Sequence, residues 1–284
     1  MPNALDLRRR IKGVKNIQKI TQAMKMVAAV RLRKAQERVK DSVPYHSALV
    51  SAMRDILRSG EDITSTLFVE RETSRSGYIV IGADKGLAGS YNSNLVKAVQ
   101  RHIAGSNSVG LVVVGRKVRD YFLRRKVAVD KAYIGISEKP SYQYAVDIAK
   151  TIIEMYVSGI YDKVYLVYTK FCSPAIQQVV VDPILPVDLG DPASALSRVA
   201  AQIYEPSLTS VLDEVVQKWI EASVYRGLVN SAASEVASRL NAMSLATDNA
   251  QDLISQLVLE YNKVRQANIT REISEIVGGA EALR

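Results

Sequence analysis

The last quarter of the chain carries an apolar pattern that constrains the fold more than any other feature. Between residues 212 and 268, positions spaced alternately by three and four residues are apolar, with three exceptions. No proline follows Pro206, and no glycine lies between Gly227 and Gly278. A period of 3.5 residues kept over this length, without helix-breaking residues, predicts one continuous helix with a single apolar stripe.

This predicted helix needs a partner helix. Residues 209–277 would form a helix about 100 Å long, which is too long for the core of one domain. Residues 1–59 also have a helical apolar pattern and are rich in helix-favouring residues, with Pro44 expected to kink or restart the helix. We therefore expect the two terminal helices to pair antiparallel, with the last turns, near residues 269–277, projecting past the first helix.

The middle of the chain has the pattern of an α/β domain. Short apolar runs at residues 78–81, 109–115, 164–168 and 178–181 predict strands, and helical patterns cover residues 94–103, 116–125 and 141–158. Strands that alternate with helices favour a mostly parallel, Rossmann-like sheet. The predicted domains are an N-terminal coiled-coil helix (1–59), the inserted α/β domain (76–200) and a C-terminal coiled-coil helix (207–284).

Composition excludes several classes of protein. The chain has 284 residues, of which 48% are hydrophobic and 24% charged, as in folded globular proteins. There is no apolar run of 18 residues and no signal-like apolar start, and the basic amphipathic start is interpreted as mature structure rather than a mitochondrial presequence. Cys172 is the single cysteine, which rules out an intrachain disulfide and a cysteine-rich zinc site.

A glycine-rich loop at residues 82–90 follows the first predicted strand, where a phosphate-binding loop would lie. Its sequence fits neither the dinucleotide pattern G-x-G-x-x-G nor the P-loop pattern, so a tight strand-to-helix turn is the favoured interpretation. No Ser-His-Asp, paired-carboxylate or metal-ligand constellation stands out. We therefore predict no catalytic, cofactor-binding or metal-binding residues, and a Rossmann-like enzyme remains a minor hypothesis.

The positive charge is concentrated at the N-terminus. Residues 1–40 hold twelve Lys and Arg against Asp6 and Glu37. One hypothesis is a coiled-coil nucleic-acid-binding protein with a basic arm, but residues 1–44 contain no aromatic side chain on which bases could stack. Other interpretations are a helix whose cations face acidic protein surfaces and an ordinary solvated face.

Four segments of the chain are distinctive: ITQAMKMVAA (20–29), DKGLAGSYN (84–92), YEP (204–206) and EYNKVRQANITREISEIVGGA (260–280). They resemble segments of one known family, the gamma subunit of F-type ATP synthase, which is the central-stalk rotor subunit. The last segment is the most specific, and the resemblance covers the whole chain in order. The lone Cys172 departs from the chloroplast type, which carries a thiol pair, so thiol regulation is not expected.

The resemblance implies a function and partners. The paired helices would stand inside a ring of alternating alpha and beta subunits, with the α/β domain beside the epsilon subunit and on the membrane rotor ring, the c-ring. Proton flow would turn the shaft, and the catalytic sites in beta would change conformation in sequence. The subunit itself would be non-catalytic and bind no cofactor and no nucleic acid. It would lie peripherally at the cytoplasmic face of a bacterial membrane, without inserting.

The resemblance also implies roles for individual residues. Positions matching family contacts with the catalytic ring are Met24, Arg239, Arg265, Gln266, Thr270 and Glu272. Tyr204 and Glu205 match the foot near the rotor ring. For a rotor of the kind that the resemblance implies, we interpret Arg8, Arg9 and Arg10 as a basic bearing face, because weak repeated ion pairs suit a surface that must slide past carboxylates.

Overall fold

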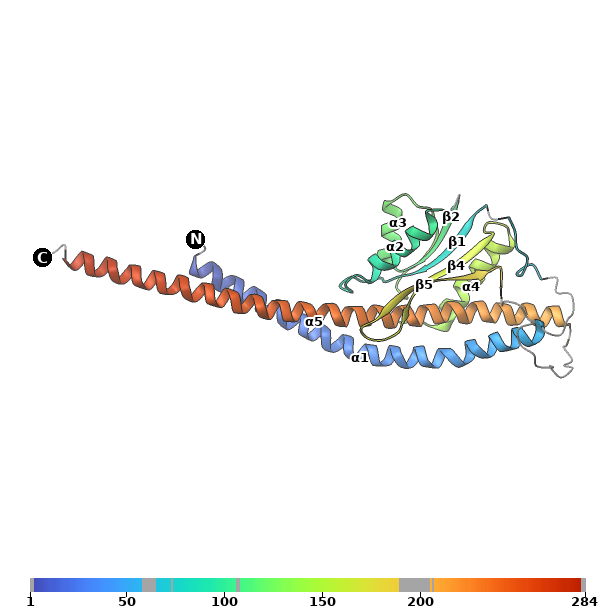
Figure 1. The fold of residues 1–284 in the computed structure, drawn as a ribbon, viewed down its shortest axis with the longest axis horizontal. Helices are drawn as coiled ribbons and strands as arrows, with labels where there is room; N and C mark the ends of the chain where they lie inside the picture. Colours follow the sequence, from blue (N-terminus) through green and yellow to red (C-terminus); the bar gives the residue numbers. More distant parts are fainter. Residues whose placement is uncertain are drawn as a thin grey trace. The chain divides into compact units, whose positions relative to one another are not determined.

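The computed structural model describes residues 3–57, 65–72, 74–105, 108–188, 205 and 207–281. Two long helices enclose an α/β segment in the sequence (Figure 1). The elements in chain order are α1 (Ala4–Leu57), β1 (Ser76–Ile81), α2 (Tyr91–Ile103), β2 (Val109–Val114), α3 (Arg116–Arg124), β3 (Val129–Tyr133), α4 (Tyr142–Val157), β4 (Lys163–Phe171), β5 (Gln177–Leu185) and α5 (Leu208–Glu281).

The five strands form one sheet in the order β3-β2-β1-β4-β5. Strands β1 to β4 are parallel, and β5 runs antiparallel to β4 as an edge strand. The register pairs Ile79 with both Val112 and Leu166, so three buried apolar strands lie side by side at the centre. Because parallel strands are connected by helices that cover both faces, such central strands carry apolar residues at consecutive positions.

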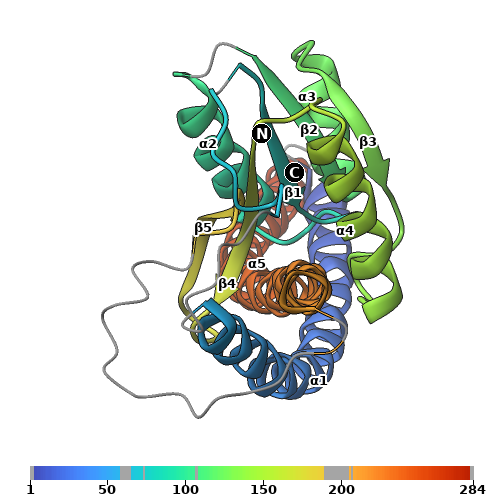
Figure 2. The same cartoon turned by 90° about the vertical axis from the view of Figure 1, so that its right-hand side faces the viewer.

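Alternate residues of each strand enter two different cores. Tyr78 and Val80 of β1 pack with α2 and α3 on one face of the sheet. Ile79 and Ile81 pack on the other face with α4, part of α5 and the end of α1. In Figure 1, α2 and α3 lie to the left of β1 and β2, and in Figure 2 the orange part of α5 lies between β4 and α1.

Contacts divide the chain into two units. The helix-pair unit consists of Met1–Ala28 and Leu240–Arg284, and the sheet unit of Ala29–Arg239. Each long helix contributes to both units. Between residues 220 and 239, α5 is almost continuously buried. A Cβ at its Gly227 would lie 2.9 Å from the Cδ1 atom of Ile81, so a larger residue there would force that side chain to shift.

The helix-pair unit has a narrow apolar seam. The Oγ1 atom of Thr247 donates to that of Thr21 at 2.8 Å, and Gln18 Nε2 donates to Gln251 Oε1 at 2.7 Å. As the residue number rises along α1, the number of the hydrogen-bonded residue in α5 falls, so the two segments run antiparallel. Buried apolar side chains of the seam are Leu7, Ala28, Met243, Ala250, Ile254 and Leu257. All residues from 271 to 280 are exposed.

The predicted fold class is confirmed: two long terminal helices flank a mostly parallel sheet. Strand β3 was not predicted, because its sequence VDKAY carries polar residues and three of its five positions are exposed. Helix α1 also continues through Pro44 instead of restarting there. Buried side chains beyond the proline, Met53 and Ile56, offset the cost of the lost backbone hydrogen bond.

Candidate functional site: an ionic junction at the 82–90 loop

The 82–90 loop leaves the carboxyl end of β1 and is fixed by Asp84. The Oδ1 atom of Asp84 accepts from the amide of Arg116 at 3.0 Å. Its Oδ2 atom accepts from the amides of Gly135 at 2.9 Å and Ser137 at 3.2 Å. These donors follow β2 and β3, so one carboxylate joins the ends of three neighbouring strands.

The environment of Asp84 favours its charged form. Partial burial raises the pKa of this carboxyl, but the amides of Gly135, Arg116 and Ser137 outweigh it, so the net pKa lies below the usual range. The amide of Arg116 belongs to the first residue of α3, where an anion is favoured by the helix dipole. Because Asp84 uses these donors and carries a negative charge, it disfavours a phosphate at this point.

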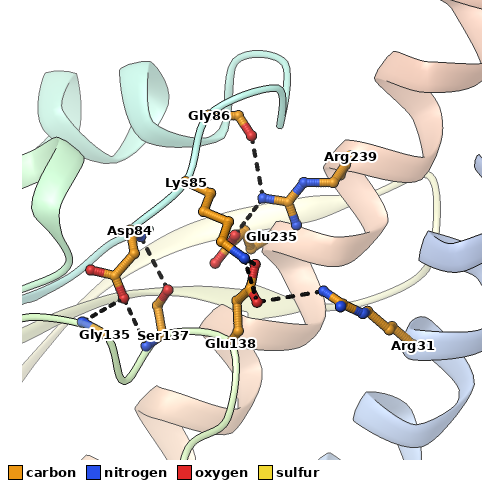
Figure 3. Close-up of polar contacts among 9 residues, drawn as sticks. All are labelled: Arg31, Asp84, Lys85, Gly86, Gly135, Ser137, Glu138, Glu235 and Arg239. Atoms are coloured by element: carbon orange, nitrogen blue, oxygen red, sulfur yellow. Dashed lines mark hydrogen bonds and ion pairs between the residues drawn. The ribbon is translucent and has the colours of Figure 1, made fainter. Parts of the chain in front are cut away.

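The next residue of the loop, Lys85, leads towards α1. Its ammonium contacts both carboxylate oxygens of Glu138, at 2.9 and 3.0 Å. The guanidinium of Arg31, in α1, reaches the Oε2 atom of the same carboxylate at 3.5 Å (Figure 3). Glu138 therefore joins the loop to α1. These contacts are partly exposed, so each stabilises the fold weakly.

The third residue, Gly86, is contacted by α5. Arg239 donates from Nη2 to the carbonyl of Gly86 at 3.3 Å and to Oε1 of Glu235 at 2.6 Å (Figure 3). The Glu235 and Arg239 side chains are only 2% and 10% exposed. Burial raises the pKa of the Glu235 carboxyl, and the charge and hydrogen bond of Arg239 oppose this rise. A buried pair of this kind depends on both partners being present.

Together these contacts form what we call the ionic junction: Arg31, Asp84, Lys85, Gly86, Glu138, Glu235 and Arg239. It lies within the sheet unit and joins the loop to both long helices. Its charged groups are occupied by one another or by backbone amides, so the arrangement positions elements. Within the described residues, no group of three or more metal-ligating side chains is found, and none of the described helices has a stretch apolar enough to span a membrane.

The residues singled out from the sequence lie in different surroundings. Arg239 is buried in the ionic junction. Met24 is half-buried, and Arg8, Arg9 and Arg10 are exposed. In the C-terminal part of α5, the side chains of Arg265, Gln266, Thr270 and Glu272 are all exposed, and the hydroxyl of Thr270 donates to the carbonyl of Gln266. Glu205 is exposed, whereas Tyr204 lies outside the described residues.

Sequence reasoning missed three members of the junction. Glu235 and Arg239 are four residues apart, a spacing typical of helical ion pairs, so this contact had a local signal. Glu138 and Arg31 are separated by 107 residues and had none. The loop itself was identified by its glycines, but its attachment to the helices depends on the tertiary fold.

Comparisons with known proteins agree with this architecture. A family model described as ATP synthase matches residues 3–283. The ATP synthase gamma chain of Heliobacterium modesticaldum is 43% identical over 289 residues, covering all of both chains. A chain from the central stalk and c-ring structure of Tetrahymena thermophila mitochondrial ATP synthase has a TM-score of 0.62 and 26% identity, covering 80% of this chain and 99% of that one.

A chain from the Euglena gracilis mitochondrial ATP synthase structure of OSCP, F1 and c-ring gives a TM-score of 0.74 at 19% identity. The match covers 99% of this chain and 94% of that one, and at this identity it supports the fold alone. The fold and the comparisons together place the chain in the class of ATP synthase subunits. Within that class, the chain belongs to the ATP synthase gamma-chain family, of the bacterial type.

Proposed function

We propose that this chain is the central rotor shaft of an F-type ATP synthase, transmitting torque between an ion-driven membrane ring and the catalytic beta subunits. One observation carries this proposal beyond family membership. Helix α5 is a single helix of 74 residues that contributes to both the sheet unit and the helix-pair unit. An unbroken helix with paired segments resists bending and twisting, which a torque-bearing element requires.

The partners follow from the family. The helix-pair unit would face the ring of alpha and beta subunits, and the sheet unit would meet the epsilon subunit and the c-ring. Exposed apolar side chains near the C-terminus, including Ile269, Ile273, Ile276 and Val277, support a further protein surface around this end. The chain would act at the cytoplasmic face of a bacterial membrane, as a peripheral subunit without catalytic residues of its own.

Residue roles are part of the same proposal. Arg265, Gln266, Thr270 and Glu272 would contact the catalytic ring, together with Met24, and Tyr204 and Glu205 would lie at the foot near the c-ring. Their exposure, where described, leaves them available for such contacts. For Arg239 the structure suggests an indirect role, because its guanidinium contacts Gly86 and Glu235. It would position the loop rather than touch the ring directly.

Co-purification is the test of this proposal. The tagged full chain, co-expressed with alpha and beta subunits of a bacterial ATP synthase, should be recovered with an alpha–beta hexamer. Removal of the chain from Ile269 onward should leave the complex assembled but lower coupled ATP synthesis. Recovery of nucleic acid in place of the hexamer, with salt-dependent binding, would instead support the nucleic-acid hypothesis.

The basic bearing face has its own test. Replacing Arg8, Arg9 and Arg10 together by glutamate should change torque or assembly, since the reversed charges would repel acidic partner surfaces. Arg33→Glu is the matched control, because Arg33 lies in the same helix with a side chain 87% exposed. Rotation and coupled ATPase activity that remain unchanged in the triple variant would count against this role.

A further inference from the structure

A cavity of about 260 Å³ lies in the sheet unit, beside the ionic junction. Residues of α1, α5 and the connection between β3 and α4 form its walls. The lining side chains are Arg31, Lys34, Ala35, Arg38, Glu138, Lys139, Pro140, Val229, Ala232 and Val236. None of these residues has a role in the rotor function proposed above, apart from the contact between Arg31 and Glu138.

The rim of this cavity is strongly positive. Arg31, Lys34 and Arg38 follow one another at intervals of three and four residues, so they share one face of α1. Lys139 supplies a fourth cation from the β3–α4 connection, and Glu138 is the single acidic side chain of the lining. Glu138 is already occupied by Lys85 and Arg31. Within the described residues, Lys34, Arg38 and Lys139 form no ion pair.

The floor of the cavity is apolar. Val229, Ala232 and Val236 of α5 are buried, and they present only aliphatic groups. The small side chains of Ala232 and Ala35 leave room between the two helices. Cations on the rim and an apolar floor are complementary to a molecule with an anionic head and an apolar body. This combination differs from an ordinary solvated basic face, which has no apolar recess.

We propose that this cavity binds a single-chain anionic amphiphile, with its carboxylate at Lys34, Arg38 and Lys139 and its apolar chain on the floor formed by Val229, Ala232 and Val236. The volume lies near the lower end of the range for ligand pockets, about 300 Å³, which favours one short chain over a two-chain lipid. The bound head group joins α1 to the 138–140 segment, next to the existing contact of Arg31 with Glu138.

Both halves of the ligand are required. The exposed cations Lys34, Arg38 and Lys139 bind a small anion weakly by themselves, because water and salt screen the charge. The apolar floor by itself offers little area and is open to any hydrophobic molecule. Together they give selectivity for an amphiphile over an inorganic anion or an alcohol, and binding stabilises the folded chain by mass action.

Titration of the purified full chain with sodium decanoate below its micelle concentration, followed by calorimetry and thermal unfolding, tests this site. We expect saturable 1:1 binding and a higher midpoint of unfolding. Acetate, inorganic phosphate and 1-decanol should each bind at least tenfold more weakly. The double variant Lys34→Glu/Arg38→Glu should lower decanoate affinity at least tenfold, and Ala232→Leu should do the same by filling the floor.

A control variant and a second rim variant separate a loss of binding from a loss of folding. Arg33→Glu changes charge on the same helix outside the cavity and should bind decanoate like the unaltered chain. Lys139→Glu alters the rim from a different segment and should weaken binding, even if a helix variant folds poorly. Circular dichroism verifies that each variant is folded.

Several results would overturn the proposal. They are the absence of saturable decanoate binding, equal binding by the double variant, and equal binding of acetate or phosphate, which would indicate a simple anion site. Binding of phosphatidylglycerol vesicles without decanoate binding would indicate a membrane surface. Binding of an acidic amphipathic peptide without decanoate binding would indicate a protein partner. Either of these last two results would mean that a membrane surface or a protein, and not an amphiphile, occupies the cavity.

Discussion

The two parts of α5 show how one sequence pattern serves two environments. Between residues 208 and 239 the helix is mostly buried, whereas between residues 240 and 281 it is mostly exposed, although the 3.5-residue apolar period continues to residue 268. In the first part, the absence of a side chain at Gly227 allows Ile81 and Leu166 of the sheet to approach the helix closely. The second part has only a narrow seam against α1.

This difference separates the part of α5 that is covered by the chain's own residues from the part that only partner subunits can cover. The buried part of α5 is held by the sheet and by the ionic junction. The exposed part carries Ile273 and Ile276 with more than half of each side chain accessible. Large apolar side chains in such numbers indicate a surface that is covered in an assembly. The predictions below test this contrast, in order of decreasing effect.

Removal of Arg239 should have the largest effect. Arg239→Met leaves Glu235 buried without its partner, so we expect a loss of about 3–5 kcal/mol in the free energy of unfolding. The double variant Glu235→Leu/Arg239→Met should recover most of this loss. Urea unfolding followed by the fluorescence of Trp219, the single tryptophan, reports on the sheet unit. A single variant as stable as the unaltered chain would exclude the junction as a stabilising element.

The same substitution at two positions of α5 should change stability by very different amounts. Ile220 is fully buried, so Ile220→Ala should cost about 2–5 kcal/mol through lost contacts and a cavity. Ile273 is 55% exposed, and Ile273→Ala should change the stability of the isolated chain by less than about 0.5 kcal/mol. Equal effects in urea unfolding, monitored by circular dichroism, would contradict the contrast between the two parts.

The stability of the sheet unit should also depend on pH through His46. Burial, together with the charge of Arg226, lowers the pKa of His46 to about 4 from the ordinary 6.5. Between these values the unfolded chain binds a proton that the folded chain does not, so stability falls as the pH drops. Because the ring is partly exposed, we expect a loss of about 1 kcal/mol. In His46→Gln, unfolding at several pH values should show a flatter profile.

A small effect is also expected at the polar pair of the helix-pair unit. Thr21→Val removes the hydrogen bond from Thr247, which should cost about 0.5–1.5 kcal/mol. The variant Thr21→Val/Thr247→Val should cost less than the sum of the two single changes, since both polar groups are then removed. Strictly additive costs in thermal unfolding would show that the two hydroxyls are not coupled.

Much of this fold could be predicted from the sequence, because it is encoded locally. The 3.5-residue period defined α5, and apolar runs of strand length defined β1, β2, β4 and β5. Strand β3 could not be predicted, since an exposed edge strand needs no apolar pattern. The glycine-rich loop was recognised, but its attachment through Glu138 and Arg239 depends on residues brought together only by the tertiary fold.

Rotation of single molecules is the most direct test of the proposed shaft. Cys172 is exposed and is the single cysteine of the chain, so a bead can be attached there without further substitution. The chain would be assembled with an immobilised alpha–beta hexamer and supplied with ATP. We expect the bead to rotate in one direction for as long as ATP is hydrolysed. A bead that stays fixed while the same assembly hydrolyses ATP at full rate would contradict the proposed function.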